Sequence, residues 1–317
     1  MIMTRIDLKD KRILAMLDKN SRMPLTEIAK KVGLNKDVVR YRIEKLEKEK
    51  VILGYYTLID THKLGYLTIR IYFELIDMNE ETEKKLIEFL DKKFNSGQIF
   101  RIDGEYQLGI ITWEKSIYQL ENKLKLLKKE FGDFIEKYEI SIFIELHNYS
   151  RKYLPNKAYE NLILKETNLV EIDKIDTNIL KALSGNARIT SVELSKKLNI
   201  PQRTVIYRIR SLEKKKMILG YRINLNISSL GYENYFLEIY THKQQNIKEI
   251  ENFALKNKNC IGIDYVLHGA DIEIETEFPQ KYELLDFLME IKNRFKYIKK
   301  IKYWSTLNYI KINYFPD

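Results

Sequence analysis

The chain has 317 residues, 44% hydrophobic and 12% aromatic, with a net charge of +10, so it can build several folded cores and wholesale disorder is excluded. No apolar run reaches the ~18–20 residues of a membrane span, the N-terminus is charged where a secretory signal is apolar, and the single cysteine, Cys260, excludes an intrachain disulfide and a cysteine-based zinc site. We therefore expect a reducing cytoplasm, no membrane partner, no metal and no cofactor.

Three short helices are predicted at the start of the chain. The first covers about residues 7–19 and the second about 25–32, because apolar residues recur there at helical spacing. Gly33 supplies the tight turn that helix-turn-helix units often contain. Asn35 is a suitable N-cap for the third helix, which ends near residue 49. Residues 51–56 follow as a strand and turn that would form a small wing.

Residues 61–153 change to a pattern of strands and amphipathic helices in the order βαββαβ. The predicted elements are a strand at 67–75, a helix at 81–93, a strand at 99–102, a turn at 103–106, a strand at 108–112, a helix at 116–131 and a strand at 139–144. A linker is predicted at 154–169, with room for a short helix at 157–165.

The second half repeats the first. Residues 7–66 align without a gap onto residues 173–232, and 25 of the 60 positions are identical. Such a repeat fixes the architecture, so 170–226 is predicted to be a second three-helix unit and 227–317 a second βαββαβ unit. Its elements are a strand at 235–240, a helix at 247–258, a strand at 260–267, a turn at 268–270, a strand at 271–277, a helix at 282–295, a strand at 298–304 and a final edge strand at 309–315.

The positive charge is confined to the repeated three-helix segments. Residues 1–60 hold 14 Lys and Arg against 9 Asp and Glu, and residues 170–226 hold 12 against 5. The two remaining stretches, 61–169 and 227–317, are each at −1. Charge that served only solubility would be spread more evenly, whereas a concentrated basic field is typical of a polyanion partner. We predict double-stranded DNA as that partner.

The two third helices share one face and differ on the other. The shared apolar residues are Val39, Ile43 and Leu46 in the first copy and Val205, Ile209 and Leu212 in the second. On the opposite face only a tyrosine persists, and in a recognition helix that face contacts base edges in the major groove. A surface drifting without constraint gives the same picture. The predicted DNA-binding residues are Lys36, Asp37, Arg40, Tyr41, Arg42, Glu44, Gln202, Arg203, Thr204, Ile206, Tyr207, Arg208 and Arg210.

Side-chain chemistry suggests different roles within this set. Arg40, Arg203 and Arg210 can donate two hydrogen bonds to guanine, and Gln202 can pair with adenine. Asp37 could accept from a cytosine amino group or orient Arg40.

The lysines of the second helices and the arginines shared by the third helices have other assignments. Arg42 and Arg208 sit beside the core face, so they are assigned phosphate or structural roles. Backbone contacts are predicted for Lys30, Lys31, Lys196 and Lys197.

These residues make the family recognisable. The run from Leu34 to Tyr55, followed by Leu64-Gly65-Tyr66, resembles the Lrp/AsnC (feast/famine) family of transcription regulators, and the second copy matches at 205–221 and 230–232. The resemblance implies an α+β fold in which two winged helix-turn-helix domains alternate with two ferredoxin-like βαββαβ (RAM-type) domains. The implied bounds are 1–60 and 170–226 for the former, 61–153 and 227–317 for the latter, and 154–169 for the linker.

The family's small-molecule site involves a hairpin written Gly-x-x-Asp. The first copy has glutamine where the carboxylate is usual, and the second copy has its acid one residue early, so both departures argue against amino-acid binding. The candidate effector residues are Gly104, Tyr106, Gln107, Gly269 and Asp271, for an amino acid or other metabolite. Both glycines are interpreted first as turn residues, since glycine permits a positive φ.

The preferred interpretation is a sequence-specific transcription regulator, not an enzyme, that self-associates through its ferredoxin-like domains. These domains are expected to pair into a pseudo-dimer, within one chain or across two, so that two non-identical recognition helices read an imperfect palindrome.

Two alternatives stay open. Sirohaem decarboxylases resemble the same plan, and His268 and Arg101 lie near the hairpins, although the histidines form no recognisable metal or nucleophile constellation (His62, His147, His242 and His268). The second alternative is a ligand-sensing or assembly scaffold without DNA binding.

Overall fold

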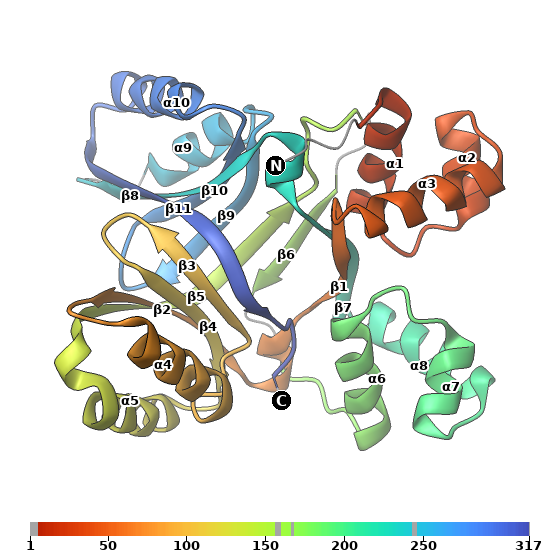
Figure 1. The fold of residues 1–317 in the computed structure, drawn as a ribbon, viewed down its shortest axis with the longest axis horizontal. Coiled ribbons are helices and arrows are strands. Elements are labelled where there is room, and N and C mark those ends of the chain that lie inside the picture. Colours follow the sequence, from red (N-terminus) through yellow and green to blue (C-terminus); the bar gives the residue numbers. More distant parts are fainter. Residues whose placement is uncertain (1–5, 156–159, 166–167, 243–245, 317) are drawn as a thin grey trace.

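The computed structural model describes residues 6–155, 160–165, 168–242 and 246–316. Two helical units lie on one side of the molecule, and a body of strands with helices on its outside lies on the other (Figure 1). A two-stranded ribbon runs between the helical units. In the described part of the chain, no helix is both long and apolar enough to cross a membrane.

Each helical unit contains the three helices that the periodicity predicts. They are α1 (Leu8–Lys19), α2 (Leu25–Val32) and α3 (Lys36–Lys48) in the first copy, and α6 (Lys174–Gly185), α7 (Ser191–Leu198) and α8 (Gln202–Lys214) in the second. Asn35 caps α3 as expected, because its side chain accepts a hydrogen bond from the Val38 N–H at 2.8 Å. Gly33 ends α2 at a φ of +69°, a left-handed conformation that glycine adopts without strain.

The strands that follow the third helices pair with each other. The strand predicted at 51–56 is present as β1 (Ile52–Ile59), but it does not turn back on itself. It pairs antiparallel with β7 (Ile218–Leu225) of the other copy. The ribbon is also exchanged between the cores, since Ile223 packs with α1–α3 whereas Ile59 packs with α6–α8. Each helical unit is thereby completed by the other copy.

The two βαββαβ units join into one ring of eight strands. The first unit has the strand order β5–β2–β4–β3 and the second has the order β11–β8–β10–β9. β3 pairs with β11 and β9 pairs with β5, so neither unit keeps a free edge at these positions. The strands are β2 (Leu67–Leu75), β3 (Gln98–Asp103), β4 (Leu108–Glu114), β5 (Ile135–Tyr149), β8 (Glu233–Thr241), β9 (Cys260–Leu267), β10 (Ile272–Phe278) and β11 (Ile298–Ile312).

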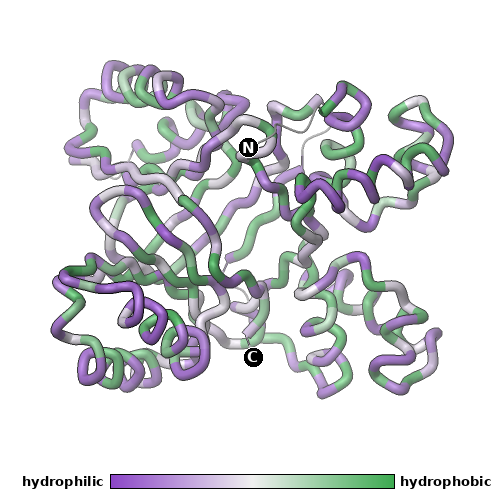
Figure 2. Tube along the Cα trace, viewed as in Figure 1, coloured by the Kyte–Doolittle hydropathy of each residue, from purple (hydrophilic) through white to green (hydrophobic). Residues whose placement is uncertain are grey.

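Helices of both units cover the outside of this ring (Figure 1). They are α4 (Glu80–Lys92) and α5 (Ile117–Phe131) of the first unit, and α9 (Ile247–Ala254) and α10 (Lys281–Arg294) of the second. Apolar residues follow the strands, whereas hydrophilic and hydrophobic residues alternate along the outer helices (Figure 2). The expected pseudo-dimer of ferredoxin-like units therefore forms within one chain.

Two of the predicted elements are wrong. Residues 309–312 continue β11 and pair with β3, with Tyr309 opposite Phe100, so they join the two units instead of forming an edge. In the linker, residues 161–165 form a strand, β6 (Asn161–Lys165), that pairs with β5. The predicted helix is therefore absent there, and its first part, 157–159, lies outside the described residues.

The ring also buries acidic side chains. Glu238 on β8 is 1% exposed and accepts a hydrogen bond from the Tyr240 hydroxyl at 2.8 Å. Its Oε1 finds no hydrogen-bond partner among the described side chains and backbone. Burial, and next the neighbouring Glu273, raise the pKa of Glu238 to about 7.

This pKa predicts a pH-dependent contribution to the free energy of unfolding that is lost in Glu238→Gln. The folded carboxyl keeps its proton to about pH 7, whereas an ordinary glutamate loses it near 4.5. The folded state therefore binds more protons between these values, and stability falls as the pH rises through that window. Urea unfolding gives the free energy of unfolding at pH 5 and at pH 8. We expect this free energy to decrease between the two pH values, and the decrease to be smaller in Glu238→Gln than in the unaltered protein by roughly 2 kcal/mol. Exposed Glu290→Gln is the control, and equal pH dependence in all three proteins would contradict the assignment.

Candidate nucleic-acid interface

Helices α3 and α8 turn their variable faces away from the molecule. The shared triplets are buried, whereas Tyr41 and Tyr207 are 66% and 69% exposed. Most of the other predicted DNA-binding residues are exposed, and the half-buried ones are Arg42, Thr204, Ile206 and Arg208. The structure therefore leaves most of the predicted interface accessible.

The arginine that both third helices share, Arg42 in α3 and Arg208 in α8, has internal partners in each copy. Arg42 Nη1 lies 2.7 Å from carboxylate oxygens of both Asp7 and Asp10. The second copy repeats this arrangement, because Arg208 Nη1 lies 2.8 Å from Asp173 and 3.3 Å from Asp176. Each arginine ties the third helix of its unit to the start of the first helix. Of the two roles predicted for these arginines, the geometry favours the structural one.

The base-reading candidates differ in their electrostatic surroundings. Arg40 Nη1 lies 3.3 Å from an Asp37 carboxylate oxygen one helical turn earlier, which agrees with the prediction that Asp37 orients Arg40. Arg203 and Arg210 form no ion pair with any residue that the structure describes. Gln202 donates to the Ser191 hydroxyl at 3.0 Å, so in this state it is partly engaged. Helix α8 therefore presents a more positive outward face than helix α3.

Two arginines that the sequence analysis did not single out join the two helical units. Arg22 Nη1 donates to the carbonyl oxygens of Ala187 and Ile189 at 2.6 and 3.1 Å. Its counterpart Arg188 donates to the Ser21 carbonyl at 3.1 Å, so the contact is reciprocal across the ribbon. The only available signal was that Arg22 and Arg188 are identical in both copies without belonging to the apolar pattern.

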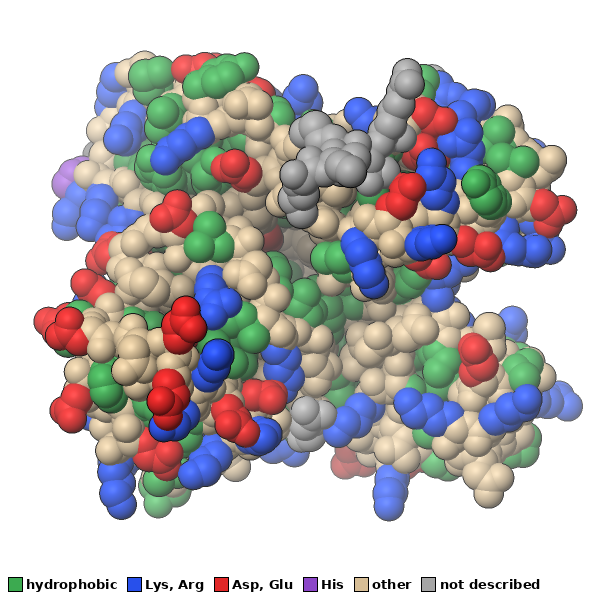
Figure 3. Space-filling view, viewed as in Figure 1, with side chains coloured by type: hydrophobic (Ala, Val, Ile, Leu, Met, Phe, Trp, Pro, Cys, Tyr) green, Lys and Arg blue, Asp and Glu red, His purple; other side chains and the backbone are tan. Residues whose placement is uncertain are grey.

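The charge distribution on the surface follows the domains. Lys and Arg side chains are spread over both helical units, while Asp and Glu are numerous over the part of the ring near α4 and α5, where Lys and Arg lie among them (Figure 3). Lys30, Lys31, Lys196 and Lys197, predicted to contact DNA backbone, are all exposed.

Three of the candidate effector residues already form hydrogen bonds within the protein. Tyr106 is buried and donates from its hydroxyl to Glu139, and the Gln107 Oε1 accepts from the Leu75 N–H at 2.8 Å. Asp271 accepts from the Thr241 N–H at 2.6 Å. Gln107 also borders a surface cavity of about 660 Å³.

Glycine is required at the two hairpin positions for different structural reasons. Gly269 has a φ of +112°, as the turn interpretation predicts. Gly104 has no such φ, so the prediction is wrong for this residue. Its reason is steric, because a Cβ there would lie 2.8 Å from the Cβ of Trp304 on β11.

The histidines remain dispersed. His147 is buried on β5, where its Nε2 lies 2.9 Å from Glu145 and its Nδ1 lies 3.0 Å from the Tyr149 hydroxyl. His268 lies in the β9–β10 turn at a φ of +65°. Among the described residues, no group of three His, Cys, Asp or Glu side chains is placed to hold a metal ion.

Comparison with known proteins places the chain in a family. A family model described as winged helix-turn-helix DNA-binding matches residues 6–52 and again residues 172–218. A leucine-responsive regulatory protein of Rhizobium meliloti is 38% identical over 145 residues, which span 45% of this chain and 93% of that protein. An uncharacterized HTH-type transcriptional regulator of Pyrococcus furiosus is 37% identical over 145 residues, spanning 45% of this chain and 94% of the relative.

A solved structure shares the overall fold. It is that of the siroheme decarboxylase NirDL, with a TM-score of 0.64 and 14% identity over 98% of this chain and 94% of that one. At this identity the likeness concerns the fold alone. The relatives are regulators, each equivalent to one half of the chain, and the DNA-binding model matches twice. The chain therefore belongs to the Lrp/AsnC family of transcription regulators, as a tandem-duplicated member.

Proposed function

We propose that one molecule of this regulator supplies both DNA-binding domains that contact an operator, and that their two recognition helices prefer different sequences. The observation that carries the proposal is the β1–β7 ribbon, which holds α3 and α8 in one chain with their variable faces exposed. A pair of recognition helices reads half-sites about 34–36 Å apart, one turn of the duplex. Because the two faces differ, the preferred site is an imperfect palindrome.

We also propose the bounds of the domains, a surface for self-association and regulation by a small molecule. The DNA-reading units are 1–60 and 170–226, and the ring is built by 61–153 and 227–317, with 154–169 between them. Since the ring already pairs its own edges, self-association between molecules would use its outer helices, where Tyr282, Leu285 and Met289 of α10 are exposed. A small molecule regulates the protein, which acts by binding DNA and not by catalysis.

A sirohaem-decarboxylase-like enzyme is the second candidate, because the likeness to NirDL spans nearly the whole chain. Addition of sirohaem to the purified protein separates the two functions. A shifted tetrapyrrole absorbance band together with loss of carboxyl groups from sirohaem would support the enzyme. An unchanged spectrum would support the regulator.

The half-site asymmetry has a direct test. Selection of binding sequences from a random DNA pool is expected to return two unequal half-sites. The chain offers its own matched variant, Lys36→Gln/Asp37→Arg/Val38→Thr/Arg40→Ile/Glu44→Arg, which gives α3 the predicted DNA-binding residues of α8. Selection with this variant is expected to return half-sites that are more nearly symmetric, because both helices then present the same donors. Symmetric half-sites already with the unaltered protein would contradict the proposal.

A further inference from the structure

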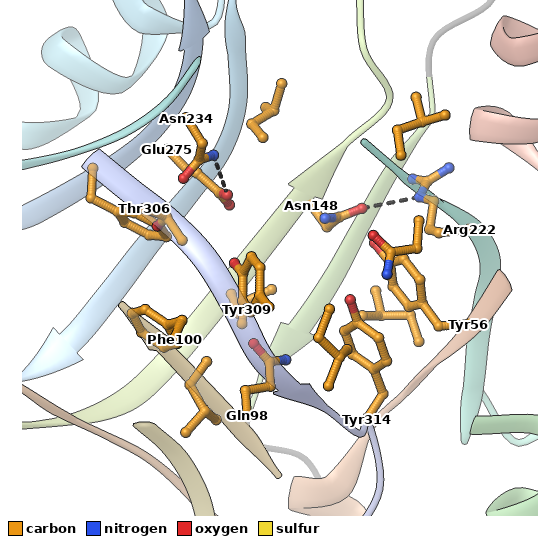
Figure 4. A pocket seen from close by; sticks show the side chains of 18 of the residues that line it. Tyr56, Gln98, Phe100, Asn148, Arg222, Asn234, Glu275, Thr306, Tyr309 and Tyr314 are labelled. Carbon is orange, nitrogen blue, oxygen red and sulfur yellow. Dashed lines mark hydrogen bonds between the residues drawn. The ribbon is translucent and has the colours of Figure 1, made fainter. Parts of the chain in front are cut away.

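The ring of strands encloses a cavity that none of the predicted functions uses. Its volume is about 750 Å³, all eight strands of the ring contribute to its lining, and it extends to the β1–β7 ribbon. Figure 4 shows side chains of β1, β3, β5, β7, β8, β10 and β11 around it. Eight-stranded barrels have room for one small ligand, and ligand cavities commonly measure about 300–1,000 Å³.

The lining is acidic although the whole chain is basic. It contains six carboxylates against three guanidinium groups and no lysine. The acidic residues are Asp18, Asp103, Glu233, Asp264, Glu275 and Glu277.

The arginines of the lining are already paired. Arg151 lies 2.7 Å from Asp18 and 2.8 Å from Glu277, while Arg70 pairs with Asp264 at 3.8 Å and with buried Glu273.

The third arginine is held in the same way. Arg222 Nε donates to the Asn148 Oδ1 at 3.0 Å, and its Nη1 donates to the Asp18 and Lys19 carbonyl oxygens at 2.9 and 2.8 Å. The guanidinium groups are therefore satisfied mainly by protein, and an anion would have to displace existing partners.

Glu275 is different, because no Lys or Arg side chain in the described part of the chain forms an ion pair with it. Its side chain accepts a hydrogen bond from the Asn234 amide, which donates to Oε1 at 2.8 Å. The Asn234 Oδ1 is buried and has no hydrogen-bond partner within the residues that the structure describes. Two acceptors therefore lie together at the cavity wall. Arg70, which is 2% exposed, also lines the cavity, and its Nε has no hydrogen-bond partner among the described residues.

Aromatic rings complete the lining. Tyr56 and Tyr314 stack with ring centroids 3.9 Å apart, and Phe100 and Tyr309 lie 5.5 Å apart. Tyr309 is 43% exposed although it points into the enclosed space, so its free surface borders the cavity (Figure 4). Aromatic faces attract organic cations, and most strongly where water is excluded.

We propose that this cavity binds a small organic cation that also carries a hydrogen-bond acceptor. The protonated amine is held by Glu275 and Asn234 among the aromatic rings, and the acceptor at the other end of the ligand receives the Arg70 Nε–H. The site is separate from the hairpin residues Gly104 and Gly269.

Three isosteric probes test the proposal on the intact protein by calorimetric titration. Tyramine carries an ammonium group, tyrosol a hydroxyl and 4-hydroxyphenylacetate a carboxylate, while all three keep the phenol. Tyramine is expected to bind at least tenfold more tightly than the other two. Equal binding of tyrosol, preferred binding of the carboxylate, or no binding of tyramine would overturn the proposal. Tyrosine binding as tightly as tyramine would assign the cavity to an amino acid and overturn it as well.

Glu275→Gln supplies the matched variant, because glutamine keeps the shape and removes the charge. It is expected to weaken tyramine binding at least tenfold and to leave tyrosol binding unchanged, whereas exposed Glu290→Gln is expected to change neither. Unaltered tyramine affinity in a folded Glu275→Gln protein would overturn the assignment. If that variant does not fold, the three probes on the unaltered protein still decide the question.

Discussion

Arg70→Met is expected to lower the free energy of unfolding by about 3–5 kcal/mol, the cost of leaving buried carboxylates without their cation. Arg70 lies on β2 of the first ferredoxin-like unit, is 2% exposed, and pairs with Glu273 and Asp264 of the second unit. Its guanidinium also lies 5.0 Å from the ring centroid of Phe143. Loss of the arginine would leave two carboxylates side by side inside the ring. Urea unfolding followed by circular dichroism measures the effect.

The chain contains a matched control for this prediction. Arg101 on β3 pairs with Glu83 at 2.8 Å, but this pair is partly exposed, so Arg101→Met is expected to cost less than about 1 kcal/mol. Adding Glu273→Met to Arg70→Met removes one of the unpaired carboxylates and is expected to restore part of the loss. If Arg70→Met costs no more than Arg101→Met, the buried ion cluster does not hold the two units together.

Arg203→Ala and Arg40→Ala are each expected to weaken binding to one half-site, by ~1–3 kcal/mol, and to relax specificity there. The reason is that each removes a guanidinium able to donate two hydrogen bonds to a guanine. The two substitutions lie on different helices, so the affected half-sites should differ. Titration of operator fragments carrying single base changes in either half measures this.

A phosphate contact gives a different result and serves as the control. Lys197→Ala, on exposed α7, is expected to weaken all sequences about equally and to reduce the salt dependence of binding, since fewer counterions are released. If Arg203→Ala also weakens every sequence equally, Arg203 contacts the backbone and base reading must be assigned elsewhere on α8.

Much of the local structure could be predicted from sequence. The strand at 67–75 and the helix at 25–32 match β2 and α2 residue for residue, because alternation and helical periodicity are local patterns. The prediction failed where local pattern was weak or was overridden. Leu162 and Leu164 alternate inward in β6, whose place in the sheet depends on β5 as partner.

The candidate site was predictable to a lesser degree. Comparison of the two copies separated core from surface on the third helices, because a shared fold constrains only the buried positions. It could not separate an arginine that binds DNA from one that holds the fold, and Arg42 was resolved only by its distances to Asp7 and Asp10. The cavity around Glu275 gave no signal, since its walls come from both halves of the chain.

The sequence by itself determined the tandem architecture, the two sets of three helices, the two βαββαβ units and the location of the positive charge. These depend on order and periodicity along the chain. Only the tertiary structure decided that β1 pairs with β7, that β3 and β9 find β11 and β5, and that an acidic cavity results. Such pairings join residues far apart in sequence, and their free energy comes from edges and faces that exist only once both copies have folded.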